Sequence, residues 1–243
     1  MDSVTEGNKS QMSVAVITGA SKGLGLALAR ALAHRGWRLV IDARDESALR
    51  AVQSDLAERS DVIAVPGDVT DPRHREALIQ EAAWLGGVDL LVNNASSLGP
   101  SPLPPLAAFP VVDLERVFQV NVLAPLALTQ GALPLVHEGG AVINVSSDAA
   151  VEAYEGWGGY GSSKAALDQL TAVLAVEHPA LRVFAFDPGD MRTAMHQAAF
   201  PGEDISDRPE PETVVPALLM LIEGRLTSGR YRASDLLREA VTA

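Results

Sequence analysis

The strongest constraint on the fold is a regular alternation of two kinds of segment along the chain. Apolar runs of strand length alternate with stretches in which apolar residues recur every three or four positions, as in amphipathic helices. Continuous apolar runs are typical of strands that are buried on both faces of a parallel sheet. The alternation therefore predicts a doubly wound α/β sheet. The runs span residues 13–18, 37–41, 61–65, 88–92, 141–145 and 181–186, and helices are expected from Leu24 to Gly36 and near residues 45–58, 71–85, 112–136 and 160–177.

The chain is expected to form one large domain. Its 243 residues and 47% hydrophobic content suffice for a sizeable core, and the sequence contains no internal repeat or low-complexity tract. Residues 13–243 are interpreted as this single domain, and the polar residues 1–12 as a flexible N-terminal tail. The proline-rich connection at residues 96–110 follows a strand, where loops commonly line ligand clefts.

Composition excludes several classes of protein. With 31 acidic and 19 basic residues the formal net charge is -12, which repels nucleic acids and anionic membranes. There is no cysteine, and the five histidines lack the spacing of metal ligands, so no metal site is expected. No apolar run reaches the length of a membrane span, and the N-terminal residues lack the apolar core of a signal peptide. We therefore expect a cytoplasmic protein with no nucleic-acid or membrane partner.

A glycine-rich turn directly follows the first apolar run. The segment TGASKGLG, residues 18–25, places Gly19, Gly23 and Gly25 at the start of the first helix. Glycine permits a tight turn and a close approach of the backbone to a pyrophosphate, whose charge is favoured at a helix N-terminus. A glycine turn alone is weak evidence, but its position after the first strand of an alternating pattern favours nucleotide binding.

Three motifs together resemble those of the short-chain dehydrogenase/reductase family. They are TGASKGLG, the NNA of residues 93–95 and the YGSSK of residues 160–164, in order within residues 14–195. The resemblance implies a single NAD(P)-binding Rossmann domain with a seven-stranded parallel sheet, helices on both faces and a last strand near residues 228–232. It also implies an oxidoreductase that transfers hydride between a nicotinamide and a small ketone, aldehyde or secondary alcohol. A homodimer or homotetramer is expected through the two long helices.

The resemblance also assigns the catalytic residues Asn121, Ser147, Tyr160 and Lys164. Tyr160 would exchange a proton with the substrate oxygen, and Ser147, rather than its neighbour Ser146, would hydrogen-bond that oxygen. Asn121 would hold a water molecule in the proton relay. Lys164 lies four residues after Tyr160, one helical turn away, and its charge is expected to lower the pKa of the phenol from about 10.

A larger set of residues is implied at the cofactor. Asp68 would contact the adenine amino group, although it could instead cap the helix near Pro72, for which Asp71 is better placed. Asn94 is expected near the adenosine ribose, and Ser96 stands where the family usually has glycine. The full set is Gly19, Ser21, Lys22, Gly23, Leu24, Gly25, Arg44, Asp68, Val69, Asn94, Tyr160, Lys164, Pro188, Gly189 and Thr193.

Two interpretations compete for the cofactor. An acidic residue at the end of the second strand normally binds both ribose hydroxyls of NAD, and Asp42 lies there. Counted from Gly19, however, the selecting position is Ala43, and an offset of one residue reverses the face of a strand side chain. Arg44 and Lys22 then match the basic residues that meet the extra phosphate of NADP. We therefore predict NADP(H), with NAD(H) as the alternative.

The substrate side is less constrained. Contacts are expected from the loop at 96–110, from Asp148 to Trp157, where Tyr154 and Trp157 could form aromatic walls, and from residues 196–212, interpreted as a lid. Within the family the sequence resembles the sepiapterin and benzil reductase group. The alternative to an enzyme is a dinucleotide-binding sensor or scaffold of the same fold, but a pure binder has no need of Tyr160 and Lys164 at this spacing.

Overall fold

The computed structural model describes residues 12–242, with side chains to residue 240, so the predicted tail lies almost entirely outside the described residues. The strands are β1 (Val14–Ile17), β2 (Arg38–Ala43), β3 (Val62–Pro66), β4 (Val88–Asn93), β5 (Val136–Val145), β6 (Arg182–Asp187) and β7 (Gly229–Arg232). The α-helices are α1 (Gly23–Ala33), α2 (Glu46–Leu56), α3 (Pro72–Trp84), α4 (Val111–Phe118), α5 (Ala124–Ala132), α6 (Gly158–Glu177), α7 (Ala194–Ala199), α8 (Val215–Glu223) and α9 (Ala233–Thr242).

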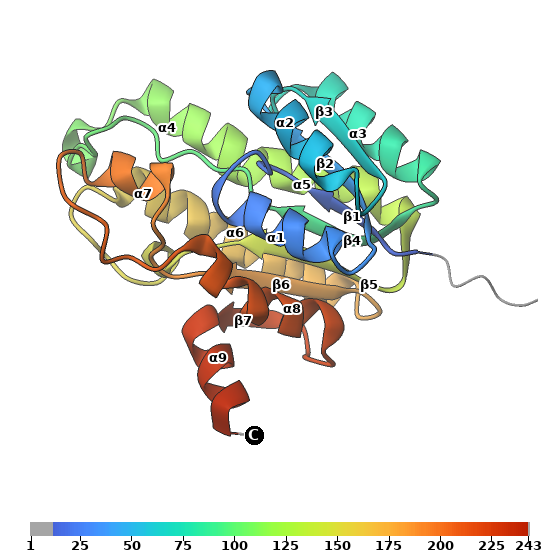
Figure 1. Cartoon of the computed structure of the whole chain (residues 1–243). Helices are drawn as coiled ribbons and strands as arrows, with labels where there is room; N and C mark the ends of the chain where they lie inside the picture. The colour runs from blue at the N-terminus through green and yellow to red at the C-terminus, as the bar shows by residue number, and fades with distance from the viewer. Residues whose placement is uncertain (1–11, 243) are drawn as a thin grey trace, which may run out of the picture.

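The strands form one parallel sheet in the order β3-β2-β1-β4-β5-β6-β7. Because side chains alternate along a strand, neighbouring residues of β1 enter different cores: Ala15 and Ile17 pack with α1, α2 and α8, whereas Val14 and Val16 pack with α3 and α5. Helices cover both faces of the sheet (Figure 1). The doubly wound fold, including the last strand implied near residues 228–232, is confirmed.

The expected continuous helix at 112–136 is wrong in its detail. It is divided into α4, a π-helical turn at Gln119–Leu123, α5 and a short 3₁₀ turn at Leu133–Leu135. Strand β5 begins directly afterwards, five residues before the predicted apolar run, because Val136 pairs with Val88 ahead of an irregularity in the ladder. The polar residues at the start of β5 hid this pairing from the apolar pattern.

Two connections that were expected to be irregular contain helical turns. Residues 96–110 include a 3₁₀ turn at Leu106–Ala108, and the segment interpreted as a lid overlaps α7, where the side chain of Thr193 accepts a hydrogen bond from the His196 amide. Within the described part of the chain, no helix is long and apolar enough to cross a membrane.

Candidate active site

One cavity of about 880 Å³ lies at the carboxyl ends of the strands. Segments that follow β1 through β6 contribute to its wall, which is where doubly wound sheets bind ligands. All the predicted site residues line this cavity except Gly25 and Asn121. Within the described residues, no group of three or more potential ligand side chains is placed to hold a metal ion.

The glycine turn depends on close contact with the chain after β4. Gly19 and Gly23 have φ angles of 67° and 57°, which side-chain-bearing residues rarely adopt. A Cβ at Gly25 would lie only 2.6 Å from both the Asn94 Nδ2 and the Gly19 carbonyl oxygen. The Asn94 amide donates to the Thr18 and Gly19 carbonyls, at 2.8 and 3.2 Å. Asn94 therefore lines the cavity while its amide nitrogen stabilises the turn.

Asp42 is turned into the protein. Its carboxylate accepts from the Gly19 amide at 2.7 Å and lies 2.9 Å from the His74 Nε2, and the residue is 1% exposed. Arg44, two residues later, is exposed at the cavity and forms no ion pair within the described residues. The inward orientation of Asp42 agrees with its offset of one residue from Ala43, the selecting position counted from Gly19.

Asp68 lies at the same end of the cavity, after β3. Burial raises the pKa of its carboxyl, but hydrogen bonds from the backbone and the hydroxyl of Thr70, together with the nearby Arg44 and His74, leave the pKa below its usual value. The cap of α3 is Asp71, which accepts from the Arg73 amide at 2.9 Å. The side chain of Asp68 therefore does not cap α3.

Helix α6 presents Tyr160 and Lys164 to the cavity from its first two turns. Tyr160 is 8% exposed and Lys164 is 2% exposed. The Lys164 ammonium donates to the Val145 carbonyl at 2.7 Å and lies 5.5 Å from the centroid of the Tyr160 ring. A Cβ at Gly161 would lie 2.6 Å from the Ala149 carbonyl oxygen, so a glycine here lets the helix pack against the segment after β5.

The sequence predicted a lowered pKa for Tyr160, and this direction is wrong for the folded protein. Burial raises the pKa of the Tyr160 phenol above its ordinary value, and hydrogen bonding with the Ser147 and Ser96 hydroxyls offsets this only in part. Burial also lowers the pKa of Lys164 to about 8, against the opposing charge of Asp168. Burial penalises the charged form of each group, so it raises the pKa of a phenol and lowers that of an ammonium. The phenol is therefore a neutral acid near pH 7.

Ser147 and Ser146 differ in their surroundings. The Ser147 hydroxyl donates to the Asp148 carboxylate at 2.9 Å and reaches Tyr160, as its effect on the pKa of the phenol indicates. The Ser146 hydroxyl is buried without a hydrogen-bond partner within the described residues. Of the two serines, Ser147 is the one that affects the pKa of Tyr160, and its role in catalysis stays a prediction.

Asn121 lies behind this pair in the π-helical turn and is fully buried. Its Oδ1 accepts from the Ser97 amide and the Ser96 hydroxyl, at 2.8 and 3.1 Å. Its Nδ2 donates to the Ser97 carbonyl and the Ser163 hydroxyl, at 2.8 and 2.9 Å. Asn121 thus joins the segment after β4 to α6, and its role in holding water stays a prediction.

The residues expected at the nicotinamide follow β6. The Gly189 amide donates to the Asp187 carboxylate at 3.0 Å, which fixes the turn that contains Pro188. Thr193 begins α7, and its methyl carbon would lie 3.5 Å from a Cβ at Gly23. The turn after β6 therefore lies against the glycine turn after β1.

Aromatic side chains form part of the remaining wall of the cavity. The Trp157 ring centroid lies 5.7 Å from that of Tyr160 and 6.0 Å from that of Phe200, whose ring is 4.9 Å from His196. His196 is 9% exposed, and its Nε2 has no partner within the described residues. Tyr154, the other expected wall, is 44% exposed, and its hydroxyl contacts the carboxylates of the same loop.

Sequence reasoning missed three parts of this site. Ser96 stands out in the sequence only as an exception to the glycine that is usual there, yet its hydroxyl affects the pKa of Tyr160. His196 was set aside with the other histidines because it lacks metal-ligand spacing. Arg230, on β7, donates to the Ser147 carbonyl at 2.8 Å. No signal in the sequence joins Arg230 to a serine 83 residues away.

Comparisons with known proteins identify the family of the chain. The family model of the short chain dehydrogenases matches residues 13–204, so the chain belongs to the short-chain dehydrogenase/reductase family and is an oxidoreductase, as its motifs predicted. Sepiapterin reductase from Rattus norvegicus is 33% identical over 209 residues, which are 80% of this chain and 80% of that protein. Benzil reductase ((S)-benzoin forming) from Saccharomyces cerevisiae is 32% identical over 240 residues, 95% of this chain and 87% of that protein. A short chain dehydrogenase from Shigella flexneri, complexed with NADP, matches with a TM-score of 0.84 at 29% identity, over 92% of this chain and 98% of that chain.

Proposed function

We propose that the protein is an NADP(H)-dependent carbonyl reductase that uses Tyr160 as its proton donor. The observation that carries this proposal is the single cavity that has the glycine turn and Arg44 at one end and Ser147, Tyr160 and Lys164 at the other. The turn can approach a pyrophosphate closely, and the unpaired Arg44 guanidinium suits a further phosphate. The bound nicotinamide would supply the hydride.

The residues of the chain would handle the proton and the developing charge. Ser147, which donates to Asp148 in the free protein, would turn to the carbonyl oxygen of the substrate and stabilise its negative charge. Tyr160 would donate its proton to the same oxygen, because its raised pKa keeps the phenol neutral. Lys164 would stabilise the resulting phenolate from one turn away.

A dinucleotide-binding sensor or scaffold is the competing proposal. Such a protein needs the glycine turn but gains nothing from burying a lysine and a tyrosine together at the far end of the cavity, since both lose hydration there. The test is a panel of carbonyl compounds, with NADPH oxidation followed by absorbance. A pterin, an aromatic diketone, an aliphatic ketone and a ketoacyl thioester cover the main classes. NADPH binding with no turnover of any compound would favour the sensor.

The aromatic wall favours a planar substrate. The rings of Trp157 and Phe200 extend the surface beside Tyr160, and aromatic faces pack well on planar apolar groups. Sepiapterin and benzil, which name two of the relatives, each carry planar ring groups of that kind. We expect the pterin or the aromatic diketone of the panel to have a lower KM than the aliphatic ketone.

Replacement of Arg44 by alanine should remove the preference for NADPH. A hydrogen bond to a charged group contributes about 1.5–3 kcal/mol, so kcat/KM with NADPH should fall about 10–100-fold. The value with NADH should change little, since NADH lacks the phosphate. Arg73→Ala, an exposed arginine on α3 outside the cavity wall, is the matched control and should leave both values unchanged. A wild-type protein that prefers NADH would contradict the assignment.

The reduction should weaken as pH rises through about 8, the pKa of Lys164. Above this pH the lysine becomes neutral and loses the charge that stabilises the phenolate, while the raised pKa of Tyr160 keeps the phenol protonated. The profile of kcat/KM against pH reports groups of the free enzyme and is the appropriate measurement. A kcat/KM that keeps rising through this range would refute the role of Lys164.

We also propose that the protein forms a homodimer or homotetramer through α4 and α6. Four exposed valines lie on these helices, and apolar surface of this kind is usual at subunit interfaces. They are Val111, Val112, Val173 and Val176. Light scattering of the purified protein measures the assembly directly, and a monomer would contradict the proposal.

A further inference from the structure

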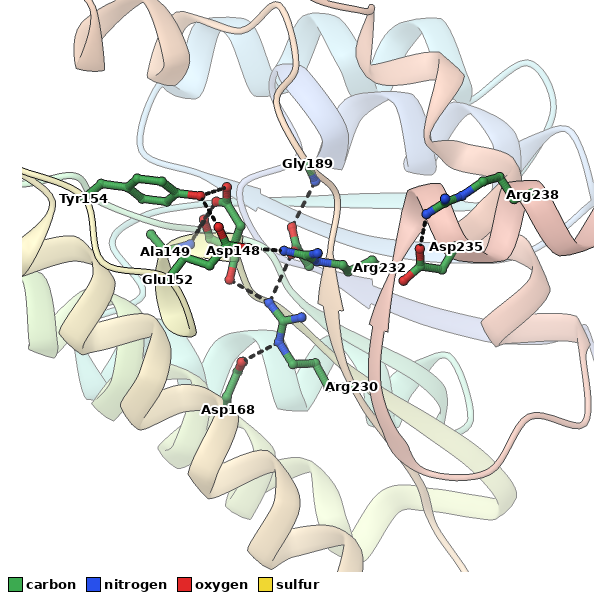
Figure 2. A network of polar contacts seen from close by, with 12 residues as sticks. Asp148, Ala149, Glu152, Tyr154, Asp168, Gly189, Arg230, Arg232, Asp235 and Arg238 are labelled. Carbon is green, nitrogen blue, oxygen red and sulfur yellow. Dashed lines mark hydrogen bonds and ion pairs between the residues drawn. The ribbon is translucent and has the colours of Figure 1, made fainter.

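Arg230 joins three elements of the site from a strand at the edge of the sheet. Its guanidinium donates to the Ser147 carbonyl at 2.8 Å, to the Asp187 carboxylate at 3.0 Å and to the Asp168 carboxylate at 3.0 Å. These acceptors belong to the segment after β5, to the end of β6 and to α6. Figure 2 shows Arg230 extended between Asp168 on the helix and the loop of Asp148.

Each acceptor is next to a residue with a proposed role in the reaction. Ser147 carries the hydroxyl that reaches Tyr160. The other oxygen of Asp187 accepts from the Gly189 amide at 3.0 Å, in the turn proposed to hold the nicotinamide. Asp168 lies one helical turn beyond Lys164 on the same face of α6, and its charge opposes the loss of the Lys164 proton. The Arg230 guanidinium therefore contacts the backbone of Ser147, the carboxylate that holds the turn at Gly189, and the carboxylate one turn from Lys164.

The arginine is also matched to its surroundings in charge. Its side chain is 26% exposed, and the Asp168 and Asp187 side chains are 15% and 3% exposed, so all three are largely removed from water. Two carboxylates that are this buried require a cation between them. The planar fork of arginine can bond to both of them and to a carbonyl at the same time, which a lysine ammonium cannot do in one plane.

The neighbouring Arg232 has a different set of contacts. It donates to the Glu152 carboxylate at 2.7 Å and lies 3.4 Å from the Asp187 carboxylate, and its side chain is 40% exposed. It contacts neither the Ser147 carbonyl nor Asp168. Figure 2 shows it directed toward Glu152, on the loop that also carries Tyr154. Arg232 is therefore a matched control on the same strand.

We infer that Arg230 is a positioning residue for the reaction, which holds the Ser147 backbone, the turn at Gly189 and helix α6 in one fixed arrangement. This inference rests on the proposed function, because it assumes that Ser147, Tyr160 and Lys164 act on the substrate. Displacement of reacting groups by about 1 Å can reduce a rate about 10²-fold. The loss of Arg230 should therefore appear in turnover rather than in cofactor binding.

The test compares Arg230→Gln, Arg230→Lys and Arg232→Gln with the wild type, using NADPH and the best carbonyl substrate of the panel. Arg230→Gln should lower kcat about 10–100-fold, with KM and the NADPH Kd changed less than about threefold. Arg230→Lys should recover part of the lost kcat, because it restores the charge but not all three bonds. Arg232→Gln should keep kcat within about threefold of the wild type.

The pH profile supplies a measurement that a purely structural role would not change. Without Arg230 the Asp168 carboxylate is no longer neutralised, so its charge should hold the Lys164 proton more strongly and raise the pKa of Lys164. The basic limb of the profile, which is the fall of kcat/KM at alkaline pH, should therefore move to higher pH. The groups on the elements around Lys164 are Tyr160 and Asp168 on α6, Asp148 after β5, Asp187 on β6, and Arg230 and Arg232 on β7. Arg230 is the group that pairs with Asp168, so its substitution should move the basic limb, whereas substitution of Arg232 should not.

The possible outcomes separate this inference from the proposed function. Positioning by Arg230 is supported if Arg230→Gln lowers kcat and moves the basic limb of kcat/KM to higher pH, and if Arg232→Gln does neither. An unchanged kcat, or equal losses in the two glutamine variants, overturns it. If Arg230→Gln does not fold, the same comparison is made with Arg230→Lys, and a wild-type kcat and limb in that variant overturn the inference. The proposed function is tested separately, by turnover in a variant that lacks the Tyr160 hydroxyl.

Discussion

Replacement of Tyr160 by phenylalanine should lower kcat for carbonyl reduction by about 10²–10⁴-fold, the usual contribution of a general acid. The substitution removes only the hydroxyl, whose pKa is affected by the neighbouring Ser147 and Ser96 hydroxyls. The ring should stay in place, since its contact with Trp157 at 5.7 Å needs no hydroxyl. NADPH binding, measured by fluorescence titration, should change less than about threefold.

Tyr231→Phe is the matched control for this experiment. Tyr231 loses the same hydroxyl, but that hydroxyl donates to the Thr227 carbonyl on the surface, outside the cavity wall. Its kcat should equal that of the wild type. Turnover in Tyr160→Phe at the wild-type rate would refute the proposed proton donor. A loss of NADPH binding in that variant would mean that the tyrosine acts on the cofactor instead.

Replacement of Asn121 by leucine should lower both stability and turnover. Leucine has a similar volume but cannot pair with the four groups that Asn121 bonds. The Ser97 amide and carbonyl would lose these partners, and the Ser163 hydroxyl would keep only its bond to the Tyr160 carbonyl. A buried polar group without a partner costs about 1–3 kcal/mol, and we expect the free energy of unfolding to fall by about 2–4 kcal/mol in total. Denaturant titration measures this change, and the loosened Ser96 segment should reduce kcat as well.

Gln119→Leu provides the comparison within the same π-helical turn. Gln119 is exposed, so the same exchange of an amide for an apolar side chain should change the free energy of unfolding by less than about 0.5 kcal/mol. Equal stabilities of the two variants would show that the bonds of Asn121 contribute nothing to the fold. In that case its position behind Tyr160 would have to be explained by the reaction alone.

Local patterns were sufficient for the parts of the site that depend on short-range geometry. Gly19, Gly23 and Gly25 could be recognised because a strand that leads directly into a helix around a phosphate needs small residues at those positions. The relation of Tyr160 to Lys164 follows from the length of one helical turn. The offset of Asp42 from the selecting position follows from the alternation of strand side chains, and the buried carboxylate agrees with it.

Other features depend on contacts between distant segments and have no local pattern. The π-helical turn at Asn121 depends on the partners of its amide in residues 96–97 and 163. The short helix α7 interrupts a polar, proline-rich stretch in which helical periodicity is weak. The raised pKa of Tyr160 depends on burial by the assembled cavity, and the spacing of Tyr160 and Lys164 predicted the opposite direction.

The sequence by itself determined the doubly wound sheet and the family, because apolar periodicity and short motifs record the local geometry of strands, turns and helix starts. Only the tertiary structure decided how charge is distributed around the reacting groups. Burial sets the pKa of Tyr160 and Lys164, and Arg230 reaches Ser147 and Asp168 only because β7 lies at the sheet edge beside β6. Desolvation and contacts between charged groups are properties of the folded arrangement, since they depend on which distant segments exclude water from the same place.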